Sequence, residues 1–252
     1  VRILRRDAER IGFPKSFTIY DSDDQQRVIK QIYKELMIDD KFLPVKSAIS
    51  QISGYKDKLL SAKDVAAEAP RDTKAALISK IYTAYSNRLR TAGAMDFDDL
   101  IFHTVQMLKT DAEAREYYQQ KFRYVVVDEY QDTNALQDAI YFALAAPDAS
   151  NLFFVGDIKQ SIYRFRQADP SVFVGKQTAW QPYPADAPVP YPEPATIALD
   201  ANFRSAPDVI RGINYFFETF FSRRLGGIDY GDGQRLVVGR KDETYPGLCE
   251  LD

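Results

Sequence analysis

Hydrophobic residues at helical spacing dominate the first part of the chain. After the polar stretch YDSDD they recur at intervals of three and four, which places them on one face of a helix: Val28, Ile29, Ile32, Tyr33 and Leu36. Ser22 precedes this run and Gln25 follows three residues later, which predicts a capping box at the helix start. Residues 45–61 and 73–93 have similar spacing, and Gly93 is expected to stop the last helix. These patterns predict a compact helical subdomain.

Short apolar runs then alternate with helical segments. Residues 124–127, 152–155 and 196–199 are each bounded by polar or turn-forming residues, and we interpret them as buried strands of a parallel α/β sheet. Polar residues follow each run: Asp128 and Glu129, Gly156 and Asp157, and residues 202–205. Because ligands bind at the carboxyl ends of such strands, we expect the three clusters to converge on one edge of the sheet.

Three aspartates stand at the start of the helical stretch MDFDDLIFHTVQMLKTD. Asp96 is placed to cap this helix, and Asp98 and Asp99 fall in its first turn, where the helix dipole favours negative charge. We therefore interpret them as capping residues rather than catalytic ones.

A proline-rich stretch and an aromatic helix occupy the last part of the chain. Six prolines lie between Pro182 and Pro194, which predicts an extended surface connector, with a ligand for an SH3-type domain as the alternative. The helix that follows carries an aromatic stripe, which we interpret as core rather than as a platform for bases: Phe216, Phe217, Phe220 and Phe221.

Composition narrows the class of protein. The 252 residues are 45% hydrophobic, enough to bury a real core, and no apolar run approaches the roughly 20 residues that span a bilayer. With 33 basic and 36 acidic residues the chain has no global basic field, so any contact with nucleic acid must be local. The single Cys249 and the single His103 exclude a disulfide framework and a zinc site, and we expect a cytoplasmic protein without membrane partners.

The acidic strand end VVVDEYQDTN offers two roles for adjacent carboxylates. One of Asp128 and Glu129 can hold hydrated Mg²⁺ while the other orients or deprotonates an attacking water, as in nucleotide hydrolysis. The alternative is that the pair merely caps the following helix.

The other two clusters carry residues suited to phosphates and bases. Gln160 can orient a water or bond a γ-phosphate oxygen, and Arg204 can stabilise charge on a transferred phosphoryl group. Alternating aromatic and basic side chains suit stacking on bases and pairing with backbone phosphates: Tyr163, Arg164, Phe165 and Arg166. The alternatives are a turn with partly buried aromatics and, for Arg204, a surface ion pair.

Taken together, these stretches resemble superfamily 1 DNA helicases of the UvrD/PcrA/Rep type, with RecB and AddA as more distant relatives. DEYQDTN resembles motif II of the family, VGDIKQSIYRFRQAD motif III and LDANFRS motif IV, in the same order. VRILRRDAERIG, FTIYDSDDQQRVIKQIYKEL and MDFDDLI are similar to the helical 1B insertion and its return to the first motor domain. Phe165 replaces a tryptophan of many members and Gln167 a glycine. The proline-rich insert and DIKQSIYRF favour the AddA/RecB branch. The amino-terminal part favours the PcrA branch instead.

The resemblance implies an ATP-dependent DNA helicase acting in repair or recombination. It implies that Asp128 binds the Mg²⁺ of ATP and Glu129 activates water. It implies further that Gln160 and Arg204 contact the γ-phosphate. By the same resemblance, motif III meets the DNA, with Tyr163 and Phe165 stacking on bases and Arg164 and Arg166 near the backbone. The implied partners are single-stranded DNA and single-strand/duplex junctions, with a nuclease or repair subunit as a further candidate.

The expected fold is an incomplete RecA-like P-loop motor domain with a helical 1B-type subdomain. Residues 1–93 would form that subdomain, 94–205 part of the first motor domain, and 206–252 the start of the following motor region. No G-x-x-x-x-G-K-[ST] loop occurs in the sequence, so we expect a segment of a longer protein that by itself neither hydrolyses ATP nor unwinds DNA.

Two alternatives of other classes remain at this point. One is a metal-dependent nuclease that uses Asp128, Glu129 and Asp132 as ligands. The other is a DNA-binding or interaction module without catalysis.

Overall fold

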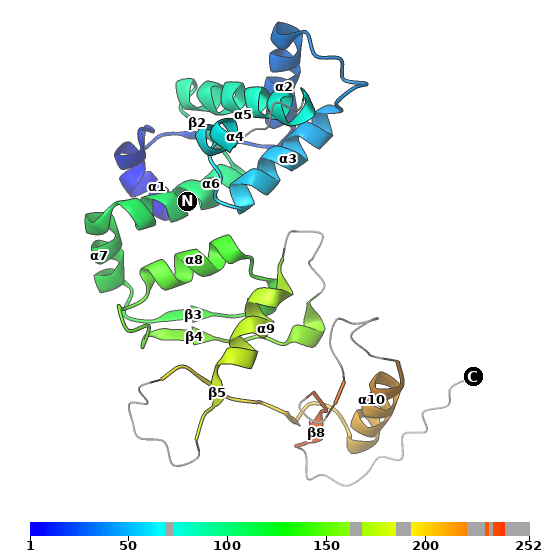
Figure 1. Ribbon diagram of the computed structural model, residues 1–252. Coiled ribbons are helices and arrows are strands. Elements are labelled where there is room, and N and C mark those ends of the chain that lie inside the picture. The colour runs from blue at the N-terminus through cyan, green and yellow to red at the C-terminus, as the bar shows by residue number, and fades with distance from the viewer. Residues whose placement is uncertain (69–72, 162–167, 185–192, 221–229, 232–233, 240–252) are drawn as a thin grey trace. The chain divides into compact units, whose positions relative to one another are not determined.

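The computed structural model describes residues 1–68, 73–161, 168–184, 193–220, 230–231 and 234–239 (Figure 1). Their contacts group them into two compact units. The first contains Val1–Gly156 and residues 168–172, and the second contains residues 157–161 and the described part of 173–239. No helix among the described residues has the length and apolar character needed to cross a membrane.

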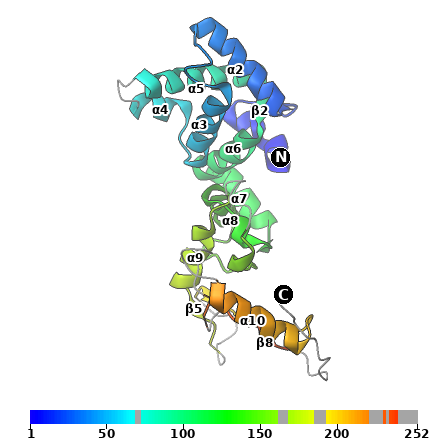
Figure 2. The same ribbon diagram turned by 90° about the vertical axis from the view of Figure 1, so that its right-hand side faces the viewer.

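The helical segment of the first unit lies between two short strands. β1 (Thr18–Tyr20) and β2 (Ala94–Asp96) pair in parallel, with Thr18 opposite Ala94. Four helices connect them and pack side by side: α2 (Ser22–Leu36), α3 (Val45–Asp57), α4 (Ala62–Glu68) and α5 (Thr73–Thr91) (Figure 2). The predicted apolar face of α2 is confirmed, because Ile29, Ile32 and Tyr33 are buried in the core of this segment.

The ends of these helices follow local chemistry. The cap of α2 is Asp21, not the predicted Ser22: the Asp21 carboxylate accepts from the N–H groups of Asp23 and Asp24, and Asp24 completes the box. Asp21 has the extended backbone that a cap needs, and its carboxylate is a stronger acceptor than a hydroxyl. Gly93, just beyond α5, has φ +59°, as expected of a helix stop.

A second group of helices includes the start of the chain. It contains α1 (Arg2–Asp7), the 3₁₀ turn η1 (Ala8–Ile11), α6 (Phe97–Thr110) and α7 (Ala112–Lys121). Leu4, Phe13, Phe17 and Met95 form its core. Asp96 caps α6 as predicted, because its side chain accepts from the Asp99 N–H at 2.7 Å.

The first two predicted strands pair in parallel, which confirms the α/β class. β3 (Val125–Val127) and β4 (Leu152–Phe154) run with Val125 opposite Leu152, and between them lie the turn η2 (Tyr130–Asp132) and α8 (Ala135–Leu144). The expectation of burial on both faces is wrong for these strands. Alternate residues point to opposite faces, and Val126 and Phe153 on one face are exposed.

The remaining elements are short. They are η3 (Ile158–Gln160), α9 (Pro170–Ala179, divided between the units), β5 (Gln181–Pro182), β6 (Ala195–Thr196), β7 (Ala201–Asn202), α10 (Pro207–Phe220) and β8 (Val237–Val238). β5 pairs with β6, and β7 pairs with β8.

The prediction of a third strand at residues 196–199 is wrong. Only Thr196 belongs to a strand, and Ile197 and Leu199 are 62% and 87% exposed. The partner of β6 is a two-residue strand that contains Pro182, and proline lacks the N–H that would extend a ladder.

The expectation that the aromatic stripe of α10 belongs to the core is also wrong. Phe216 and Phe220 are exposed, although they were expected in the core. The buried residues of this helix, Ile210 and Asn214, are four apart, and Phe217 continues their face toward the ring of Tyr230, 5.6 Å away. Phe216 and Phe220 therefore lie on another face, while Phe221 and most of the proline-rich stretch (185–192) lie outside the described residues.

Candidate functional site

An acidic loop, residues 128–134, follows β3. Asp128 and Glu129 are both exposed, and Asp128 Oδ1 accepts the Glu129 N–H at 2.9 Å. The alternative in which this pair caps α8 is wrong. The cap is Asn134, whose side chain accepts from the Gln137 N–H at 2.9 Å. The carboxylates of Asp128 and Glu129 therefore do not cap the start of α8.

The backbone of Glu129 has an unusual conformation. Its φ of +54° and ψ of +39° lie in the left-handed region, which non-glycine residues occupy at an energetic cost. Its carboxylate oxygen Oε2 accepts a hydrogen bond from Gln131 Nε2 at 2.5 Å. The side chain of Glu129 is therefore held in one direction by a neighbour two residues away.

Gln131 is a residue that sequence reasoning missed. It is buried, unlike the carboxylate that it holds. No spacing rule singles it out, because its bond to Glu129 depends on the left-handed turn between them. We add Gln131 to the site as a residue that positions Glu129.

Tyr130 anchors the acidic loop to the neighbouring strand and helix. Its N–H donates to Val155 O at 2.9 Å, and its ring stacks on Phe154 with the centroids 4.2 Å apart and the planes 8° apart. Its hydroxyl donates to the carboxylate of Asp138 on α8. Burial, followed by this hydrogen bond, raises the pKa of Tyr130, so the phenol stays protonated. The loop is thereby fixed at its centre.

Gly156, two residues beyond the end of β4, lies close to the acidic loop. A Cβ atom at this position would lie 2.7 Å from Gln131 Oε1 and 3.2 Å from the backbone nitrogens of Gln131 and Tyr130. Only glycine fits this approach without displacement. Gly156, the first residue of the second predicted polar cluster, thus meets the acidic loop at one edge of the β3–β4 pair.

Asp132 does not join Asp128 and Glu129 in a cluster of three ligands. Its Oδ1 is buried without a hydrogen-bond partner in the described part of the chain, and burial and the charge of Glu129 raise its pKa. Across the described ranges there is no group of three or more His, Cys, Asp or Glu side chains that could hold a metal. The three side chains that the nuclease alternative requires as joint metal ligands therefore do not form such a group.

Asp128 and Glu129 by themselves suit a magnesium ion that keeps most of its waters. Mg²⁺ prefers carboxylate oxygens and is commonly bound through one or two carboxylates together with substrate phosphates. Both side chains are exposed at the end of a strand, where such a ligand can reach them.

Gln160 lies in the second unit, where it is held by Asp157. Its Nε2 donates to Asp157 Oδ2 at 3.0 Å, while Lys159 Nζ lies 2.9 Å from Asp157 Oδ1. Burial acts to raise the pKa of Asp157, but the contacts from Lys159 and Gln160 outweigh it, and the pKa is lowered. The charged carboxylate of Asp157 therefore holds the side chain of Gln160 in place by a hydrogen bond.

Arg204 also lies in the second unit, in a tight turn after β7. The backbone N–H groups of Arg204 and Ser205 both donate to Asn202 Oδ1, at 3.0 and 2.9 Å. This turn directs the chain from β7 into α10. Because Asp128 and Glu129 belong to the first unit, the assembly of all four residues into one site stays a prediction, and the motif III residues Tyr163, Arg164, Phe165 and Arg166 lie outside the described residues.

Comparison with known proteins gives a consistent result. The model of the UvrD/REP helicase N-terminal domain matches residues 1–181. Over all 252 residues the chain is 38% identical to proteins named ATP-dependent DNA helicase PcrA from Staphylococcus epidermidis and Staphylococcus aureus. The alignment covers 100% of this chain and 32% of each relative, so the chain spans about a third of their length.

Proposed function

The chain belongs to the UvrD/REP helicase family, and on this premise we propose that it forms part of an ATP-dependent DNA helicase. This enzyme would couple hydrolysis of Mg-ATP to movement on single-stranded DNA and to duplex unwinding, in repair or recombination. The observation that carries the proposal is the acidic loop: two exposed carboxylates at a strand end, one of them held by Gln131. The 38% sequence identity to PcrA proteins over the whole chain favours the UvrD/PcrA branch over the AddA/RecB branch.

In this proposal Asp128 binds Mg²⁺ and Glu129 acts on the attacking water. The bound ion would neutralise charge on the phosphates of ATP. Glu129 would orient the water and accept its proton, and the bond from Gln131 supports this role because it fixes the direction of the carboxylate. Gln160 and Arg204 would contact the γ-phosphate, with Asp157 holding Gln160.

Motif III would form the contact to DNA. Tyr163 and Phe165 would stack on bases, and Arg164 and Arg166 would lie near the backbone phosphates. The substrates would be single-stranded DNA and single-strand/duplex junctions, and a nuclease or repair subunit is a candidate partner. We further propose that the protein acts in the cytoplasm.

The domain plan follows the same family. Residues 1–93 would be the helical 1B-type subdomain, 94–205 part of a RecA-like P-loop motor domain, and 206–252 the beginning of the next motor region. The first boundary falls between α5 and β2, so that the helices α2 to α5 precede the strand β2, which pairs in parallel with β1.

The test compares the full-length protein with the 252-residue chain. The full-length protein should hydrolyse ATP with stimulation by single-stranded DNA, and Glu129→Gln should lower this rate by at least about 100-fold, the usual worth of a general base, while binding of single-stranded DNA persists. Glu116→Gln, an exposed site on α7, is the matched control and should match the wild type. The 252 residues by themselves contain no P-loop sequence and should hydrolyse no ATP. Robust hydrolysis by them, abolished by Glu129→Gln, would sink this last proposal.

A further inference from the structure

Lys56, near the end of α3, has a buried ammonium group between two carboxylates. Its Nζ lies 2.6 Å from Asp96 Oδ2 and 2.7 Å from Asp99 Oδ1. The whole lysine is only 2% exposed, and both aspartates are buried. A buried charge is costly unless it is paired and hydrogen-bonded, so each of these three groups depends on the others.

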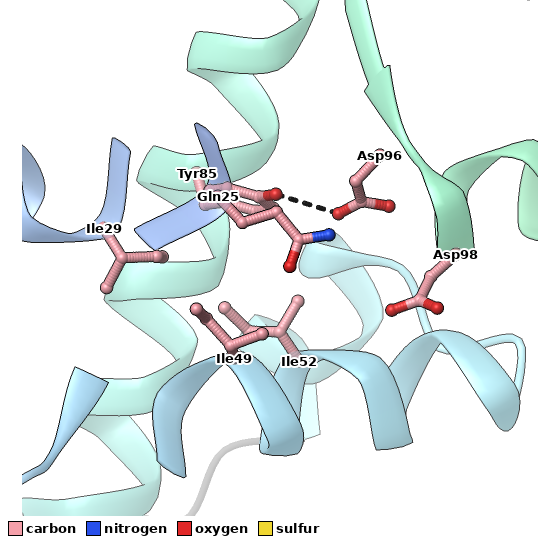
Figure 3. Close-up of a pocket in the computed structure, with 7 residues that line it drawn as sticks. All are labelled: Gln25, Ile29, Ile49, Ile52, Tyr85, Asp96 and Asp98. Atoms are coloured by element: carbon pink, nitrogen blue, oxygen red, sulfur yellow. Dashed lines mark hydrogen bonds between the residues drawn. The ribbon is translucent and has the colours of Figure 1, made fainter. Parts of the chain in front are cut away.

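The two aspartates already cap a helix. Asp96 Oδ1 accepts the Asp99 N–H at 2.7 Å, and Asp99 Oδ2 accepts the Asp96 N–H at 3.2 Å, which forms the capping box of α6. The Tyr85 hydroxyl donates to Asp96 Oδ2 at 2.9 Å, beside a small pocket that Gln25 and Asp98 also line (Figure 3). Because both carboxylates of this capping box are buried, the Lys56 ammonium supplies the opposite charge that they need.

The ion pairs of Lys56 also connect two parts of the fold. Lys56 belongs to the helical segment between β1 and β2, whereas Asp96 ends β2 and Asp99 stands in the first turn of α6. The ion pair therefore joins residues 40 positions apart in the chain and ties α3 to the start of α6. We call Lys56, Asp96 and Asp99 the lysine clasp.

α6 begins at the lysine clasp and is linked to the acidic loop through α8. It packs along α8, the helix that follows that loop. Asp138 on α8 accepts the hydroxyl of Tyr130, the residue that anchors the loop next to Glu129. A shift of the start of α6 would therefore be passed through packed helices to the carboxylates of the candidate site.

We propose that Lys56 is a positioning residue of the helicase: through its ion pairs, Lys56 couples the helical segment to the acidic loop. This inference rests on the proposed function. In this proposal the helical segment takes part in binding single-stranded DNA, and that binding changes the orientation of Glu129 only while the lysine clasp holds α3 on α6. Without the ammonium, α3 and α6 move independently, and DNA binding no longer accelerates ATP hydrolysis.

The experiment uses the full-length protein with Lys56→Met. Lys46→Met removes the same charge from an exposed position on the same helix and serves as the control. The Lys56 variant should keep its basal ATPase rate and its affinity for single-stranded DNA within about twofold. The DNA-stimulated rate and the unwinding rate should fall about three- to tenfold, which lies within the roughly 2- to 30-fold coupling that single residues carry. Unchanged stimulation would overturn the inference, and so would equal loss of basal and stimulated rates.

A second variant separates coupling from folding. Lys56→Met leaves two buried carboxylates without their cation. Adding Asp99→Asn removes one of these charges and keeps an amide oxygen that can accept the Asp96 N–H in the capping box. The double variant should recover part of the melting temperature that Lys56→Met loses, because only Asp96 still lacks its cation, but it should recover none of the stimulation by DNA. Recovery of both would show that Lys56 serves folding alone and would overturn the inference. A wild-type protein without any ATPase activity would instead contradict the proposed function.

Discussion

Gln131 Nε2 donates a hydrogen bond to Glu129 Oε2 at 2.5 Å, across a turn in which Glu129 has left-handed backbone angles. A buried amide thus directs an exposed carboxylate. Since the backbone strain and the hydrogen bond act on the same residue, the direction of this side chain is set before any ligand binds.

Gln131→Leu in the full-length protein should lower kcat for DNA-stimulated ATP hydrolysis about tenfold and leave KM for ATP nearly unchanged. The reason is that a hydrogen bond to a charged group is worth about 1.5–3 kcal/mol and here acts on the orientation of Glu129. Steady-state kinetics check this. Gln120→Leu, at an exposed position on α7, is the control, and equal kcat values for both variants would contradict the role of Gln131.

Gly156→Ala should destabilise the protein by about 1–3 kcal/mol, because the added methyl group would overlap Gln131 Oε1 and two backbone nitrogens. Gly54→Ala is the matched control. No atom lies within 4 Å of its added Cβ inside α3, so the same change should stabilise by about 0.5–1 kcal/mol. Urea unfolding of both variants measures the difference, and a neutral Gly156→Ala would show that the loop gives way freely.

His103 should make the protein sensitive to acid. Burial between Phe13 and Phe102 lowers its pKa to about 4, so the folded state binds fewer protons than the unfolded state between about pH 6.5 and pH 4. Its contribution to stability is therefore complete above pH 6.5 and is lost as the pH falls toward 4. His103→Gln should flatten the fall of the melting temperature in this range. An unchanged slope would rule out His103 as the cause.

Asp57 should act in the opposite direction. Burial and the nearby charge of Asp98 raise its pKa to about 6, so the folded state favours the protonated acid. Its contribution is complete below about pH 3.8 and is lost as the pH rises through 6. Asp57→Asn should raise the melting temperature at pH 8 and have little effect at pH 4. Glu116→Gln, at an exposed position, should show no such dependence on pH, and a matching response of both variants would refute this account.

Phe165→Ala in the full-length protein tests the proposed contact to DNA. Loss of one stacked base is worth about 1–3 kcal/mol, so binding of single-stranded DNA should weaken at least about fivefold and unwinding should fall with it. Basal ATP hydrolysis should change little. Equal loss of binding, unwinding and basal hydrolysis would count against a stacking role.

Local patterns in the sequence were enough to predict much of the first unit. The apolar spacing of α2, the cap at Asp96 and the stop at Gly93 depend on residues within one or two turns of each other, and all three are confirmed. The parallel pair β3 and β4 was also predictable, because two apolar runs separated by a helix favour that arrangement.

The sequence by itself determined which residues are apolar on one face and which chemistry the strand ends carry. Only the tertiary structure decided what covers each face, since periodicity does not identify a partner: Phe216 and Phe220 are exposed, and residues 197–199 form no strand. It also decided the contacts of Lys56 with Asp96 and of Gln131 with Glu129. The first joins residues 40 apart and the second needs a left-handed turn, so in both cases the geometry comes from the folded backbone.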